Sequence, residues 1–248
     1  MTSNDGPRSD RGVAPLVANL VCGSPKRNHD FDFARMQLAH VLYDAYGIRT
    51  DCYQDYEDTE AILVGDLLVS YTSQVPVSDA ACAALRRWLE GGGRWFALHA
   101  SNSVLDNPIL PTILGTRFLS HPPYQRFSVA IAAPDDPLLE GVPPFEVDDE
   151  LYCIEDVTHD LDVLLSTRWG GSAFGGHEFE VADRPLMYRR AVGSGGVLYL
   201  ALGHANRPYD KPFPDSPDQP DHRGPWHLPV YRELVRRGVE WAARRRPF

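Results

Sequence analysis

Short apolar runs alternate with longer amphipathic segments through the first part of the chain. Apolar runs predict buried strands at four places: residues 15–22, 48–53, 66–71 and 94–98. Residues 31–46 and 79–90 instead repeat their apolar positions with a helical period, and a glycine follows each segment. This alternation of strands and helices predicts a parallel sheet that is covered by helices on both faces.

The second part of the chain has the patterns of an antiparallel sheet. Apolar side chains alternate or cluster in four further predicted strands: residues 125–132, 162–167, 185–192 and 197–202. A glycine-rich turn over 193–196 joins the last two into a hairpin, and Pro229 begins a final helix. We therefore expect an α/β, flavodoxin-like three-layer sandwich. Its mostly parallel central sheet gains antiparallel strands in the second half, within one domain over 13–248.

Two segments are predicted to lie outside this sandwich. Residues 1–12 are polar and lack the apolar stretch of a secretory signal, which indicates a disordered tail. Residues 207–229 are dense in proline and aspartate and predict an irregular surface excursion, either a lid or a disordered insertion.

Composition narrows the class of partner. The formal net charge of −10 disfavours binding to nucleic acid, and no apolar run is long enough to span a membrane. Neutral small molecules are the easiest ligands for such a chain, and we expect a cytoplasmic protein. The four cysteines lie far apart without a C-x-x-C pair, so we expect neither a zinc ribbon nor disulfides. A homo-oligomer stays open.

Three histidines are placed where a parallel sheet binds its ligands, beyond the carboxyl ends of its strands. His29 follows the first predicted strand, His99 follows residues 94–98, and His204 follows the last strand. A shared catalytic or ligand-binding rim is one interpretation. The alternative is that His99 and His204 stabilise turns and that His29 lies in a solvated loop.

A second group of candidates lies between the two sets of strands. Asp148, Asp149 and Glu150 form an acidic loop that is either solvated or offers Glu150 as a general base or metal ligand. Tyr152 could donate a hydrogen bond to a substrate. His121 could contact a sugar or pack on a neighbouring tyrosine. His99, Glu150 and His204 are compatible with zinc or manganese, although no short metal-binding motif demands a cofactor.

Five motifs in order resemble the ThuA-like family of trehalose utilisation. They are Trp88–Gly93 with Phe96–Ala100, Leu114–Phe118 with His121-Pro122, Asp149–Tyr152, Gly195–Tyr199 with Leu202–His204, and Glu240–Ala242. The sequence departs from the family pattern at Thr116, where a glycine is usual, and in the length of 207–229.

The resemblance implies the fold of class I glutamine amidotransferases, in which a cysteine nucleophile follows a strand. His99 stands at that place here, so amidotransferase chemistry is not expected. It implies instead an enzyme that isomerises, eliminates or hydrolyses a disaccharide or a 3-keto sugar. Glu150, His99 and His204 would be catalytic, and His29, His121 and Tyr152 would bind the sugar. The alternative is a non-catalytic sugar-binding or regulatory module.

Overall fold

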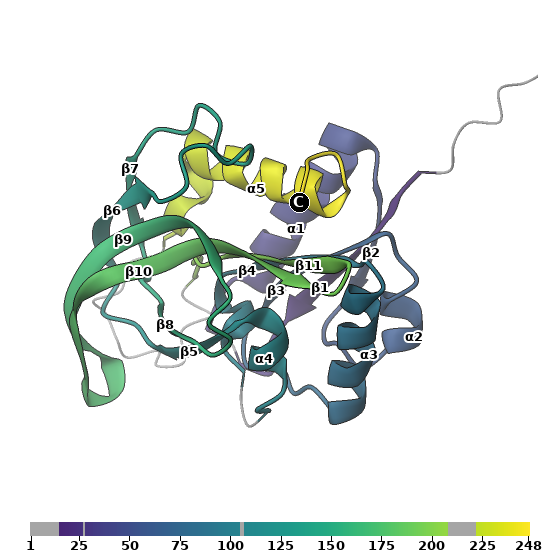
Figure 1. Ribbon diagram of the computed structural model, residues 1–248, viewed down its shortest axis with the longest axis horizontal. Coiled ribbons are helices and arrows are strands. Elements are labelled where there is room, and N and C mark those ends of the chain that lie inside the picture. The colour runs from purple at the N-terminus through teal and green to yellow at the C-terminus, as the bar shows by residue number, and fades with distance from the viewer. Residues whose placement is uncertain (1–14, 27, 105–106, 208–221) are drawn as a thin grey trace, which may run out of the picture.

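One nine-stranded mixed sheet organises the computed structural model, which describes residues 15–26, 28–104, 107–207 and 222–248 (Figure 1). In spatial order its strands are β2 (Arg49–Tyr53), β1 (Val17–Gly23), β3 (Leu67–Thr72), β4 (Arg94–Leu98), β11 (Gly195–Leu200), β10 (His177–Val192), β9 (Asp162–Ala173), β6 (Gln125–Ile131) and β7 (Phe145–Asp149). Strands β2 to β11 are parallel, and those from β10 onward pair antiparallel. The parallel part has the strand order of flavodoxin-like folds, which confirms the predicted class.

Helices cover both faces of the parallel strands and make the three layers (Figure 1). Above the sheet in this view lie α1 (Phe31–Tyr46) and α5 (Pro229–Ala242); below it lie α2 (Thr59–Ile62), α3 (Asp79–Glu90) and α4 (Leu110–Leu114). The Ser78 side chain accepts the Ala81 N–H at 3.1 Å and so caps α3, as the sequence predicts. No helix within the described residues is long and apolar enough to cross a membrane.

The helices predicted at 31–46, 79–90 and from Pro229 all form, because each buries one apolar face against the sheet. All four cysteines are free, as expected. The sequence analysis missed α4 and three strands, two of which, β5 (Thr116–Ser120) and β8 (Cys153–Asp156), form a separate antiparallel pair. Polar and charged residues interrupt the apolar pattern in all three strands, so tertiary pairing decides their conformation.

The hairpin of β9 and β10 is much longer than the strands predicted at 162–167 and 185–192. It forms the curved ribbon at the left of Figure 1 and extends past the other strands. The short helix η2 (Phe174–Gly176) makes its tip. Most side chains between Arg168 and Arg184 are partly or fully exposed, which explains why no buried-strand pattern marks this extension.

The prediction of an irregular surface excursion over 207–229 is wrong for its final part. Residues 224–227 form the helix η4 (Gly224–His227), in which Trp226 is 4% exposed. The Trp226 indole donates to the Gly203 carbonyl at 2.8 Å and anchors η4 beneath the end of β11. Aromatic burial of this kind outweighs the local preference for loop structure. Residues 208–221, and the predicted tail 1–12, lie outside the described residues.

An acid–base pattern on α5 gives a test of this fold. Glu233 accepts hydrogen bonds from Arg236 and Arg237, and chiefly the Arg236 bond lowers the pKa of Glu233 to about 2. Its pKa in the unfolded chain is higher, so the stabilisation is present above pH 4.5 and is lost as the pH falls toward 2. We expect Glu233→Gln to lower the free energy of unfolding by about 1 kcal/mol at pH 7 and by much less at pH 3.

Urea denaturation at both pH values measures this difference. The exposed Glu140 lies on a loop outside α5, and Glu140→Gln is the control, with no change expected at either pH. An equal loss at pH 7 and pH 3 for Glu233→Gln would show that the charge of Glu233 does not stabilise α5.

Candidate active site

The three strand-end histidines converge at the carboxyl edge of the parallel strands. His29 follows β1, His99 follows β4, and His204 follows β11, and all three are almost fully buried. The His99 Nε2 atom lies 3.1 Å from His29 Nε2 and 3.3 Å from His204 Nδ1. Residues that are far apart in the sequence therefore present three imidazole nitrogens to one small volume.

Glu150 completes this group from the opposite side. Its Oε2 atom lies 2.9 Å from His204 Nδ1 and 3.9 Å from His99 Nε2. Ligand atoms of His29, His99, Glu150 and His204 all lie within 4.8 Å of one another. We call these four residues the histidine–glutamate cluster. The acidic loop of the sequence analysis is thus not solvated at Glu150, and Asp148 and Asp149 belong to β7.

The backbone fixes the orientation of His99. Its Nδ1 atom lies 2.7 Å from the carbonyl oxygen of Ala201, which can only accept, so Nδ1 carries the proton in the assigned tautomer. The lone pair of Nε2 then points into the cluster. His99 itself has a φ of +47° at the sharp turn from β4 into η1 (His99–Asn102), and the Tyr199 hydroxyl donates to its carbonyl at 2.6 Å. Such strain is held in place by the surrounding contacts.

The two remaining predicted residues flank the cluster. The Tyr152 hydroxyl lies 3.4 Å from His29 Nε2, and His121 Nε2 lies 3.8 Å from Glu150 Oε2. The Nδ1 atom of His121 lies 2.8 Å from the Pro122 carbonyl oxygen, so its proton is on Nδ1 and its Nε2 has a free lone pair. The His121 side chain is 23% exposed, which makes it the histidine that faces the entrance. His121 does not pack on Tyr124, whose ring stacks on His222 instead.

Asp149 is a functional residue that the sequence analysis did not single out from its acidic neighbours. Its buried carboxylate accepts the backbone N–H groups of Gly203 at 2.8 Å and His204 at 3.0 Å. It thereby fixes the backbone that carries His204, while the next residue, Glu150, reaches the cluster. The only signal in the sequence is its place beside Glu150, because the partners of Asp149 lie far along the chain.

Electrostatics favour neutral imidazoles beside one ionised carboxylate. Burial and then the neighbouring His204 lower the pKa of His29 well below its ordinary value and that of His99 to about 3. Burial raises the pKa of Glu150, but the surrounding imidazoles, His204 first, outweigh it and hold that pKa well below its usual range. At neutral pH the cluster is therefore a set of electron-pair donors with a negative charge at its centre.

This donor set fits a divalent metal ion. Two imidazole nitrogens on one tetrahedral zinc ion, each about 2.0–2.1 Å from it, lie about 3.3 Å apart. The separations of 3.1 and 3.3 Å at His99 Nε2 agree with that spacing. Neutral imidazoles and an ionised carboxylate are also the forms that bind zinc or manganese without first losing protons.

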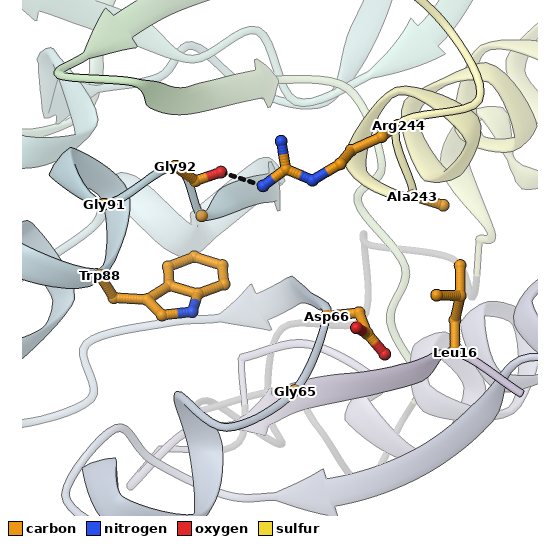
Figure 2. Close-up of a pocket in the computed structure, with 9 residues that line it drawn as sticks. Leu16, Gly65, Asp66, Trp88, Gly91, Gly92, Ala243 and Arg244 are labelled. Atoms are coloured by element: carbon orange, nitrogen blue, oxygen red, sulfur yellow. Dashed lines mark hydrogen bonds between the residues drawn. The ribbon is translucent and has the colours of Figure 1, made fainter. Parts of the chain in front are cut away.

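A cavity of about 300 Å³ lies elsewhere, at the amino ends of the strands (Figure 2). Figure 2 shows the Arg244 guanidinium bonded to the Gly92 carbonyl and the Trp88 ring on the wall below it. A Cβ atom on Gly93 would lie 2.3 Å from that ring, so glycine is needed there for packing. The glycine run that carried part of the family resemblance thus serves the fold and is remote from the histidines.

Comparison with known families decides the kinship. A family model described as ThuA, trehalose utilisation, matches residues 21–214. The chain belongs to the ThuA family. No curated protein sequence matches it.

Solved structures agree with this assignment in fold. A ThuA-like protein from Parabacteroides merdae has 16% identity and a TM-score of 0.68, over 94% of this chain and 91% of that one. For a ThuA-like protein from Bacteroides uniformis the values are 19%, 0.65, 96% and 95%. A GMP synthase protein from Thermoplasma acidophilum has 9% identity and a TM-score of 0.52, over 94% of this chain and 99% of that one.

Asp149 offers a test of how this ThuA-family site is held. Asparagine has one acceptor oxygen, so Asp149→Asn would turn an N–H donor toward a backbone N–H. Leaving a buried donor unsatisfied costs about 1–3 kcal/mol, and we expect that loss in the free energy of unfolding. Because His204 would shift, we also expect added Zn²⁺ to bind about 10–100-fold more weakly.

Urea denaturation and zinc titration measure both effects. Asp148→Asn is the matched control, since Asp148 is the adjacent residue of β7 and is only partly buried. Unchanged stability and zinc affinity in Asp149→Asn would show that Asp149 does not position His204.

Proposed function

We propose that this ThuA-family protein is a metal-dependent enzyme that acts on a disaccharide or a 3-keto sugar derived from one. The single observation that supports the proposal most strongly is the buried convergence of His29, His99, Glu150 and His204. Burying an ionised carboxylate costs several kcal/mol unless a cation or donors compensate it, and the family description refers to trehalose utilisation. Both facts point to a cation beside a sugar.

In this proposal the cluster residues bind the metal, and His121 handles the proton. The sequence-based expectation gives Glu150 the role of base and His29 a role in binding sugar. Their atoms lie among the ligand atoms instead, so we assign both to the metal. His121 has a free Nε2 lone pair and faces the entrance, which suits a general base.

The chemistry suits a sugar with a ketone beside a ring C–H. His121 removes that proton, and the electron pair of the C–H bond moves toward the carbonyl oxygen to form an enolate. A bound divalent ion supplies Lewis-acid stabilisation of that oxygen. Returning the proton to the neighbouring carbon isomerises the sugar, whereas expulsion of the glycosidic oxygen eliminates it. Burial raises the pKa of Tyr152 well above its ordinary value, so its phenol stays protonated to donate to a hydroxyl.

A metal-dependent hydrolase is the second enzyme interpretation of the same cluster, and chelation would abolish its activity too. A non-catalytic sugar-binding module would bind sugar without forming product. The free lone pair of His121 at the entrance favours an enzyme over such a module, since sugar binding alone needs no base beside an electron-pair cluster.

Elemental analysis tests the metal site. We expect about one zinc or manganese ion per chain in protein purified without chelators, and loss of that ion in His99→Ala and Glu150→Ala, because each removes a ligand atom. His40→Ala is the control, since His40 lies on α1 with a 70% exposed side chain and should leave the metal in place. Equal metal content in all four proteins, or none in any, would contradict the site.

Substitution of His121 separates the enzyme from the binding module. We expect His121→Gln to retain the metal but to lower turnover of 3-keto-trehalose about 10²–10⁴-fold, because the base is lost and no assigned ligand is. Product analysis by mass spectrometry distinguishes isomerisation, elimination and hydrolysis. Wild-type protein that binds the sugar with its metal present yet forms no product would favour the module.

A further inference from the structure

A continuous row of aromatic rings connects the histidine–glutamate cluster with the tip of the β9–β10 hairpin. Its members are Tyr152, Phe118, His121 and Phe174, and we call it the aromatic wall. The Tyr152 ring lies 4.3 Å from the His99 ring and 5.7 Å from the His121 ring, centre to centre. The His121 ring lies 5.1 Å from that of Phe174. The wall therefore begins at a cluster residue and ends at a residue of the hairpin tip.

Exposure increases along the wall. Tyr152 is 3% exposed and the side chain of His121 is 23% exposed, whereas Phe174 is 48% exposed. An isolated exposed phenylalanine needs no explanation in itself. Phe174 differs because its ring is the outer end of a row whose inner end touches His99.

The tip of the hairpin is fixed to the site by two hydrogen bonds at one residue. The Phe174 N–H donates to the His121 carbonyl at 3.0 Å, and the Ser120 hydroxyl donates to the Phe174 carbonyl at 2.7 Å. Gly175 and Gly176 both have a φ near +75°, which lets the chain reverse directly after Phe174. Phe174 is thus held in place before any ligand binds, and a ring that is already ordered loses little entropy on binding.

We propose that Phe174 is the platform for the second sugar ring of a disaccharide whose first ring lies at the histidine–glutamate cluster. This inference rests on the proposed function and names its substrate class more narrowly. The face of a pyranose ring that carries several C–H bonds is apolar and packs on an aromatic ring, while its hydroxyls need polar partners. The polar partners lie at the inner end, at Tyr152, His121 and the cluster, and the exposed apolar ring lies at the outer end.

This arrangement predicts selectivity between ligands of one and two rings. A monosaccharide would occupy the inner end alone and would not reach Phe174. A disaccharide would gain the contact with Phe174. The long β9–β10 extension, which the core of the sheet does not require, would then set the size of the preferred substrate.

The test is titration calorimetry of the metal-loaded protein with trehalose, maltose and glucose. We expect Phe174→Ala to weaken the binding of the better-bound disaccharide about tenfold and that of glucose less than about twofold, while Phe174→Trp retains disaccharide binding. Tyr43→Ala is the matched control, because Tyr43 is an aromatic residue of α1 that is 70% exposed. It should change neither affinity.

Two results would overturn the inference. One is an equal effect of Phe174→Ala on glucose and on the disaccharides, and the other is wild-type protein that binds neither disaccharide more tightly than glucose. Metal content is measured in the same samples. If it is normal in wild-type protein and absent in His99→Ala, the metal site of the proposed function stands although the platform fails. If metal is absent throughout, the proposed function fails first.

Discussion

The hydrogen bonds from the backbone of Gly203 and His204 to the buried carboxylate of Asp149 hold the two halves of the sheet in register at the site. Asp149 ends β7, the outermost antiparallel strand, whereas Gly203 and His204 follow β11 in the parallel part. Burial raises the pKa of Asp149 to about 7, although the Gly203 N–H lowers it. Without this connection Glu150 would have no fixed position beside His204.

The same region carries an unusual concentration of buried polar groups. His29, His99 and His204 are each no more than 3% exposed, and His29 Nδ1 has no hydrogen-bond partner among the described residues. A core normally avoids such groups because desolvation is costly. Their retention at the carboxyl edge of the sheet is what a binding site requires, and a divalent ion would compensate both the lone pairs and the charge of Glu150. Structural packing alone does not account for this chemistry.

The antiparallel strands have a role beyond enlarging the sheet. They deliver Asp149 and Glu150 to the edge formed by the parallel strands, and the β9–β10 hairpin places Phe174 against His121. The similar fold of the Thermoplasma acidophilum GMP synthase protein shows that the scaffold is shared by proteins with other printed names. In this chain His99 occupies the turn after β4, and the four free cysteines lie outside the cluster. The site therefore differs in chemistry while the scaffold stays alike.

Local elements and the places of the histidines follow from the amino-acid sequence alone. Apolar periodicity marks α1, α3, β4 and α5 because each buries one face or the whole strand, and the strand–helix alternation follows from the same burial. It also put His29, His99 and His204 after strands, where parallel topology brings them to one edge. Motif order further indicated the ThuA family, which the family model confirms.

The remaining features depend on tertiary contacts. The partners of Asp149, the return of η4 under β11 and the docking of Phe174 on His121 all join residues that are distant in sequence, so no local pattern records them. The strands β5, β7 and β8 carry polar residues and form because neighbouring strands satisfy their backbone groups. Local periodicity reports which face of an element is buried, but it cannot report which distant side chain that face meets.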